Sequence, residues 1–304
     1  RKEQHMNQRI YLNEDWLFTE QFQESLAAPE YPEETLQPVR IPHTCKETPF
    51  HYFDESLYQM VSGYRRHLQI PTSWQGKRIL LTFEGAAHDS TVWCNGRKVG
   101  EHHCGYTAFT VDLAAYVNYG QDNLLCVRLD SREDLNVPPF GYVIDYMTYG
   151  GIYRDVYLEV KEQIALQDIF VHSQITPQAE AAWVISEITL HEVAKDIQVR
   201  QYYALRGDAA ISGVALNETS DVTWQLLCEQ SLSSDTVGGT EMRIQGTIPH
   251  PALWNTEHPH LYLLKTQLWQ GETLLDESEV TFGIREAVFK KDGFYLNGKK
   301  LRIR

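Results

Sequence analysis

The loop at residues 141–151 holds the side chains of this sequence that are best suited to chemistry. It combines one carboxylate, that of Asp145, with three tyrosines and two consecutive glycines. The tyrosines are Tyr142, Tyr146 and Tyr149, and the glycines are Gly150 and Gly151. A single carboxylate among aromatic rings, on a loop held by a rigid strand, is suited to recognising a polar ligand. An aspartate in a loop also commonly caps a turn, and the residues alone leave both functions open for Asp145.

The strand that would hold this loop is predicted at residues 152–160, directly after the two glycines. Its side chains alternate with the period of a half-buried β-strand, and Ile152, Val156, Leu158 and Val160 share one face. Arg154 falls on that same face, so we expect its guanidinium to pair with a buried carboxylate or with carbonyl groups. Two glycines before the strand would let the backbone turn sharply and approach a neighbour closely.

Other acidic and metal-binding side chains give weaker signals. Acidic pairs occur in polar segments, where solvated surface charge is the expected state. These pairs are Glu33-Glu34, Asp54-Glu55 and Glu133-Asp134. His102, His103 and Cys104 lie together, but no second pair follows at the spacing of metal ligands, so no metal site and no cofactor are predicted. The five cysteines are too scattered for a disulfide framework, and we expect free thiols in a reducing cytoplasm.

Composition limits the class of protein. A chain of 304 residues is expected to form two domains, each with its own core. The formal net charge of −14 argues against a nucleic-acid partner, because no basic stretch offsets it. No apolar run approaches the length needed to cross a membrane, so no membrane partner is expected either.

Short β-strands separated by turn residues dominate the rest of the sequence. Asn95-Gly96 and Asn297-Gly298 each stand between two β-rich runs and predict hairpins, because both turn residues must accept a positive φ. About seven further strands follow residue 163, the number found in an immunoglobulin-like sandwich. The sequence therefore predicts an all-β protein, with a β-sandwich or jelly roll at 1–162 and an immunoglobulin-like β-sandwich at 163–286. Trp93 and Trp254 are predicted to be core anchors.

Several motifs, taken in order, resemble those of glycoside hydrolase family 2, which includes the β-galactosidases and β-glucuronidases. The stretch from Asp145 to Val156 is similar to the family's D-x-x-x-Y-x-G-[IL]-x-R-x-V pattern. Earlier matches are Gly63-Tyr64-Arg65-Arg66, Phe83-Glu84-Gly85, Val92-Trp93, Asn95-Gly96 and Gly105-Tyr106-Thr107, and later ones are Pro251-Ala252-Leu253-Trp254-Asn255 and Phe282-Gly283-Ile284-Arg285. Each motif alone is weak, whereas their number and order across nearly the whole chain make the resemblance strong.

The resemblance implies a sugar-binding, galactose-binding-like first domain and an immunoglobulin-like second domain. It also implies that residues 287–304 are the truncated start of a catalytic TIM barrel. Glycosidases that retain the configuration of the sugar need two carboxylates about 5 Å apart. In the family both are glutamates of the barrel, so no catalytic residue is expected in this chain. Asp145 is expected to bind the substrate.

The function implied is that of the non-catalytic amino-terminal part of a retaining exo-glycosidase, a β-galactosidase in the first place. It would help to complete the pocket for a β-glycoside substrate and contribute to homo-oligomer contacts in a cytoplasmic enzyme. The chain ends within a β-rich run at 301–304, which we interpret as the cut end of a longer protein.

Two alternatives to a β-galactosidase stay open. A β-glucuronidase is one, because the loop at 57–62 lacks the sugar-contacting asparagine that some β-galactosidases place there. A stand-alone carbohydrate-binding module is the other, since the jelly-roll fold also permits it.

Overall fold

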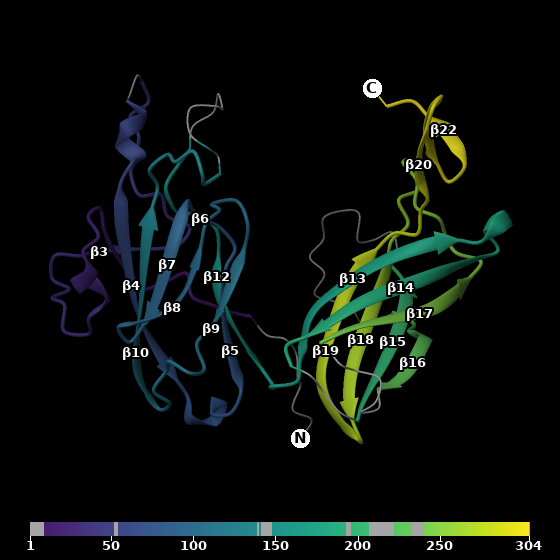
Figure 1. Ribbon diagram of the computed structural model, residues 1–304, viewed down its shortest axis with the longest axis horizontal. Coiled ribbons are helices and arrows are strands. Elements are labelled where there is room, and N and C mark those ends of the chain that lie inside the picture. Colours follow the sequence, from purple (N-terminus) through teal and green to yellow (C-terminus); the bar gives the residue numbers. More distant parts are fainter. Residues whose placement is uncertain are drawn as a thin grey trace. The chain divides into compact units, whose positions relative to one another are not determined.

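Two compact units make up the chain, which divides between Lys161 and Glu162. The computed structural model describes residues 9–51, 54–138, 140, 148–192, 196–206, 222–232 and 240–303 (Figure 1). Regular structure in these residues is almost entirely β-strand, which confirms the all-β prediction.

A two-layer β-sandwich forms the first unit (Figure 1). One layer is a six-stranded antiparallel sheet in the order β3 (Gln37–Val39), β2 (Trp16–Thr19), β4 (Val61–Ile70), β10 (Gln121–Asp130), β7 (Asp89–Cys94) and β8 (Arg97–His102). The other layer has four strands in the order β1 (Ile10–Tyr11), β12 (Val156–Lys161), β5 (Arg78–Phe83) and β9 (Phe109–Asp112). Alternating apolar side chains of both layers fill the space between them, and Trp16, Tyr64 and Phe83 are fully buried there.

The predicted hairpin at Asn95-Gly96 joins β7 to β8. Both turn residues have a positive φ, 49° at Asn95 and 76° at Gly96, as a tight hairpin turn requires. The Asn95 side chain also accepts a hydrogen bond from the Leu124 amide and donates one to the Asn123 side chain. The turn is therefore fixed both by its own backbone and by the neighbouring strand.

A short segment, residues 20–36, covers the outer face of β4 and β10 and creates a second small core. It includes the 3₁₀ helix η1 (Glu24–Ala27), whose Leu26 packs over Cys126. The Trp93 ring lies in this outer cluster, stacked 5.6 Å from Phe22, and not in the main core. Trp93 therefore packs against a hydrophobic core, but that core is the outer one and not the sandwich interior. That interior is filled instead by Trp16, whose indole donates a hydrogen bond to the Leu12 carbonyl.

Arg65 ties the covering segment to the sheet. Its side chain is 1% exposed and donates hydrogen bonds to the carbonyl oxygens of Leu26 and Ala28. Glu33 supplies the balancing charge at 2.9 Å. The prediction that Glu33 is a solvated surface charge is thus wrong, because a guanidinium taken out of water needs a counter-ion.

The strand predicted at 152–160 is in fact two strands. β11 (Gly151–Ile152) pairs with β6 (Ala86–Ala87), whereas β12 pairs with β5 in a different sheet. Asp155 lies in the break, where its carboxylate accepts a hydrogen bond from Asn13 at 2.9 Å. Arg154 consequently leaves the apolar face. Its side chain is 56% exposed and pairs with the partly exposed Glu84 at 3.4 Å, so the prediction of a buried Arg154 pair is wrong.

The second unit contains another β-sandwich (Figure 1). One sheet has the order β13 (Leu166–Ile175), β14 (Ala181–Leu190) and β17 (Glu241–Pro249), and the other has the order β16 (Gln225–Leu232), β15 (Ile197–Leu205), β18 (Tyr262–Gln270) and β19 (Thr273–Phe282). These are seven strands in the described residues, the number that the sequence predicted. Between the sheets, the buried Gln201 donates a hydrogen bond to Thr266 and accepts one from Ser186, which satisfies its amide inside an apolar core.

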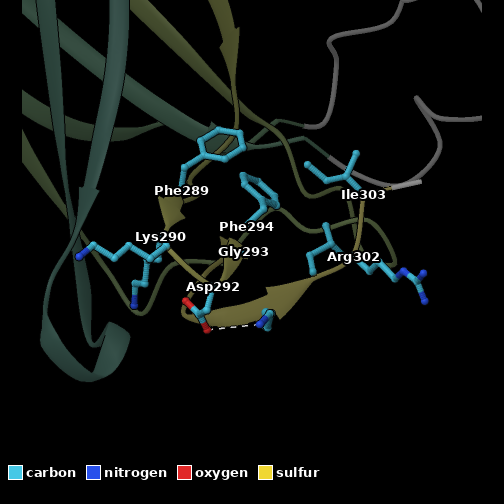
Figure 2. A pocket seen from close by; sticks show the side chains of 10 residues that line it. Phe289, Lys290, Asp292, Gly293, Phe294, Arg302 and Ile303 are labelled. Atoms are coloured by element: carbon cyan, nitrogen blue, oxygen red, sulfur yellow. Dashed lines mark hydrogen bonds and ion pairs between the residues drawn. The ribbon is translucent and has the colours of Figure 1, made fainter.

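Residues 287–301 form a small sheet of their own, with strands β20 (Ala287–Lys290), β21 (Gly293–Leu296) and β22 (Lys299–Leu301). The predicted Asn297-Gly298 hairpin joins the last two. A hollow of about 700 Å³ lies on this sheet. Figure 2 shows the Phe289 and Phe294 side chains among those that line it. Phe289 is 78% exposed. Trp254, predicted as a core anchor, is only half-buried and lies under the Arg285 guanidinium at 4.7 Å.

Candidate functional site

The two glycines at the end of the candidate loop lie against the protein's own backbone. The Cys45 amide donates a hydrogen bond to the Gly150 carbonyl at 2.9 Å, and the His43 amide donates to the Ile152 carbonyl at 2.8 Å. Gly151 has a φ of +129°, and a Cβ there would lie 2.3 Å from the His43 carbonyl oxygen. The backbone at these glycines therefore approaches a neighbour closely, as predicted, and the neighbour is the loop at residues 43–45 of the same unit.

Buried groups beneath this junction hold it in place. Ser131 is fully buried, and its hydroxyl donates a hydrogen bond to the Tyr58 carbonyl. A Cβ at Gly150 would lie 2.4 Å from the Ser131 Cβ, so only glycine fits. Burial raises the pKa of the Cys45 thiol, which keeps this sulfur protonated and unreactive at neutral pH.

The two joined loops line an open hollow of about 540 Å³. Its lining residues come from 44–50 and 149–153, and they are Thr44, Lys46, Glu47, Thr48, Phe50, Tyr149 and Tyr153. Phe50 is completely exposed and Tyr149 is 50% exposed, so both aromatic side chains are open to solvent. The Tyr149 ring meets the edge of the buried Tyr58 ring at 5.0 Å, which fixes its orientation.

The polar groups of this hollow are mostly engaged elsewhere. Lys46 pairs with Glu20 at 2.8 Å, so its charge is balanced. The Tyr153 hydroxyl donates a hydrogen bond to the Gly105 carbonyl at 2.5 Å, and the Thr44 hydroxyl donates to the Gly150 carbonyl at 3.3 Å. What the hollow presents is therefore chiefly aromatic surface.

Asp145, the predicted substrate-binding residue, lies outside the described residues, as do Tyr142 and Tyr146. Tyr149 is the member of the predicted set that the structure describes, and it lines the hollow. Asp145 comes four positions before Tyr149, so their Cα atoms are at most about 14 Å apart. The hollow thus lies at the base of the loop that carries Asp145.

No sequence pattern pointed to the second loop that lines the hollow. Lys46 and Phe50 occur in a loop without periodicity, and no pattern separates them from ordinary surface residues. The only available signal was a single phenylalanine in an otherwise polar loop, which is also common on inert surfaces.

The histidines near Cys104 have separate partners. His103 Nδ1 lies 2.6 Å from the Asp89 carboxylate, and His102 Nε2 lies 2.8 Å from the Thr107 hydroxyl. Within the described part of the chain, no group of three or more histidine, cysteine, aspartate or glutamate side chains is arranged to hold a metal ion. The described residues also include no helix long and apolar enough to cross a membrane.

Each of the two β-sandwiches matches a protein-family model. Residues 11–162 match the model described as glycosyl hydrolases family 2, sugar binding domain, and residues 167–285 match the model described as glycosyl hydrolases family 2. The chain belongs to glycosyl hydrolase family 2. Members of this family are glycoside hydrolases, and the resemblance of the motifs around Asp145 and Trp254 is thereby confirmed at the level of the family.

Curated relatives in family 2 include enzymes of two specificities. The chain is 32% identical over 297 residues to a β-galactosidase of Thermoanaerobacter pseudethanolicus and 31% identical over 304 residues to one of Thermoanaerobacterium thermosulfurigenes. It is 29% identical over 255 residues to a β-glucuronidase of Bacteroides fragilis. These matches cover 97%, 98% and 80% of this chain but only 38%, 40% and 34% of the relatives.

Solved structures of family 2 proteins share the fold. A family 2 member from Bacteroides cellulosilyticus superposes with a TM-score of 0.78 at 23% identity, over 97% of this chain and 38% of that one. The β-glucuronidase 2 of Bacteroides uniformis gives 0.77 at 24% identity, over 98% and 35%. The pair of β-sandwiches is therefore the architecture of solved family 2 structures.

Proposed function

We propose that the chain is the non-catalytic part of a larger retaining exo-glycosidase that hydrolyses β-galactosides. The observation that carries this proposal is the pair of consecutive family 2 matches on a chain that spans 38% and 40% of two β-galactosidase relatives. In the complete enzyme, the first sandwich would complete the substrate pocket and the second would connect it to the catalytic portion.

The chemistry of glycoside hydrolysis supports a division of labour between this chain and a further portion. A retaining enzyme needs an acid/base carboxyl and a nucleophilic carboxylate about 5 Å apart, both held rigidly. Among the described residues that line the hollow, Glu47 is the single carboxylate. We therefore assign both catalytic groups to a barrel that would begin at residues 287–304, the segment in which β20–β22 lie.

Asp145 is the residue of this chain that we assign to substrate binding. A carboxylate accepts hydrogen bonds and donates none, so it suits the hydroxyl groups of a sugar. The supporting geometry is the rigid junction of Gly150 and Gly151 with residues 43–45, which holds one end of the loop. The loop would thus present Asp145 from a firm base.

A β-glucuronidase is the second candidate, because relatives of that specificity match the chain at similar identity. The described cation at the hollow, Lys46, is already paired with Glu20. No uncompensated positive charge therefore lies among the described residues that line the hollow, so a specificity for glucuronides would need a cation elsewhere in the complete enzyme.

The decisive experiment is expression of the complete reading frame followed by assays with the 4-nitrophenyl glycosides of galactose and glucuronic acid. We expect a higher kcat/KM for the β-galactoside and no turnover of either compound by residues 1–304 alone. Preference for the glucuronide would establish the second candidate. Turnover by residues 1–304, in proportion to their concentration, would contradict the assignment of catalysis to another portion.

A further inference from the structure

Apolar packing and a charged side chain hold the covering segment, residues 20–36, on the first sandwich. Leu26 lies directly over Gly63, where a Cβ would come within 2.2 Å of a Leu26 methyl group. The Arg65 guanidinium donates hydrogen bonds to the carbonyl oxygens of Leu26 and Ala28. An arginine keeps its charge throughout the pH range in which proteins are folded, so this attachment does not depend on pH.

His67 provides a second attachment, and this one needs a proton. Its Nε2 atom lies 3.0 Å from Glu33 Oε1 on the covering segment, and its Nδ1 atom contacts the Asp122 carboxylate of β10. A protonated imidazole donates a hydrogen bond from each nitrogen, whereas a neutral one has a single N–H and leaves the other carboxylate facing a lone pair. Both contacts are therefore satisfied only while His67 is charged. Partial burial is outweighed by these bonds, and the pKa of His67 accordingly lies above its usual 6.5.

The remaining charged groups around His67 largely balance one another. Two acids and two cations share a hollow of about 670 Å³ with it, namely Glu14, Asp15, Arg40 and Arg66. Arg40 pairs with Glu14 at 2.8 Å, and Arg66 donates hydrogen bonds to the carbonyl oxygens of Glu14 and His67. The other acids of the covering segment are exposed, and they are Glu24, Glu30 and Glu34. The protonation of His67 thus depends chiefly on Glu33 and Asp122.

Two buried thiols of the first unit lie in different cores. Cys126 is fully buried in the outer core, beneath Leu26 of the covering segment. Cys45 is 2% exposed and belongs to the main core, where its amide is bonded to Gly150. Opening of the covering segment alone would therefore expose Cys126, whereas unfolding of the whole sandwich would expose both thiols.

We propose that protonation of His67 controls how often the covering segment opens. The imidazolium joins Glu33 to Asp122 and keeps the segment closed on β4 and β10. Loss of the proton removes one of the two hydrogen bonds, so the segment opens more often. Arg65, which also pairs with Glu33 at 2.9 Å, keeps the sandwich beneath it intact. This device is a property of the first unit and is independent of the glycoside that the complete enzyme hydrolyses.

The test measures alkylation of the two thiols by N-ethylmaleimide in residues 1–304 at pH 6 and pH 9, with the labelled peptides resolved by mass spectrometry. Rates in His67→Gln are divided by those of the unaltered protein at the same pH, which cancels the pH dependence of thiol reactivity. At pH 6 the ratio for Cys126 should be about twofold to fivefold, the value of one partly exposed ion pair. At pH 9 it should fall to about one, and for Cys45 it should be about one throughout.

Two further variants make the result specific. His103→Gln removes an exposed histidine whose partner, Asp89, belongs to β7 and not to the covering segment, so the Cys126 rate should not change. Asp122→Asn removes one of the two carboxylates at the His67 ring and should make the segment open at a lower pH. The inference would be overturned by a Cys126 ratio of one at pH 6, by the same raised ratio at both pH values, or by a Cys45 rate that rises equally. Resistance of Cys126 to alkylation in both proteins at pH 9 would overturn it as well.

Discussion

Replacing Gly151 with alanine should destabilise the first unit more than the same replacement at Gly76. A side chain at a φ of +129° costs about 1–3 kcal/mol in backbone strain. The new Cβ would also lie 2.3 Å from the His43 carbonyl oxygen, which forces residues 43–45 away from 150–152. Two backbone hydrogen bonds would then be lost at about 1 kcal/mol each. After an offset of about 0.4–1 kcal/mol from the unfolded state, the net loss is about 2–4 kcal/mol.

Gly76 is the matched control for this substitution. It lies in the same unit and has a φ of +84°, but nothing lies within 4 Å of the position of a Cβ. Gly76→Ala should therefore cost only the backbone strain less the same offset, about 1 kcal/mol. Urea unfolding, followed by tryptophan fluorescence, should show a midpoint about 1–2 M lower for Gly151→Ala. Equal midpoints for the two variants would refute the argument that the tight junction at residue 151 matters.

Three further predictions concern charged groups of the first unit. Glu33→Ala leaves the Arg65 guanidinium buried without its counter-ion and should cost about 1.5–3 kcal/mol in urea unfolding, whereas the exposed Glu34→Ala should cost little. Partial burial is outweighed by hydrogen bonds to Asp122 and Glu33, which raise the pKa of His67 above 6.5 in the folded protein. The contribution of His67 to the free energy of unfolding is therefore complete below pH 6.5 and is lost as the pH rises through the higher folded pKa. His67→Gln should remove that pH-dependent loss. Burial lowers the pKa of His88 below 6.5 in the folded protein. The contribution of His88 to the free energy of unfolding is therefore complete above pH 6.5 and is lost as the pH falls toward the folded pKa. Between pH 7 and pH 5, the His88→Gln variant should lose less stability than the unaltered protein.

Hairpins and strand positions could be predicted from the sequence because their causes are local. Asn95-Gly96 accepts the positive φ of a tight turn whatever surrounds it, and the flanking strands carry their alternation in a few residues. The break after Ile152 was not predictable in this way. It arises because β11 and β12 pair with strands of different sheets, which is a long-range choice that the alternation of Ile152, Arg154 and Val156 conceals.

The site was only partly accessible to sequence reasoning for a similar reason. The pattern around Asp145 located one loop, but the hollow needs a second loop almost a hundred residues earlier, and Phe50 has no motif of its own. Glu33 shows the same limit, because its neighbour Glu34 is exposed while Glu33 meets Arg65 across 32 residues of sequence. Burial of an ionic pair depends on the segment that covers it, and a single sequence does not encode that directly.

The most direct test of the proposed function is the kinetics of Asp145→Asn in the complete enzyme. Asparagine keeps the shape of the side chain and removes its charge, so the expected loss is about 1.5–3 kcal/mol of transition-state binding. This predicts a fall of roughly tenfold to a hundredfold in kcat/KM for 4-nitrophenyl β-galactoside, with little change in the thermal midpoint. Full activity of the variant, or a loss explained by unfolding alone, would contradict a substrate-binding function for Asp145.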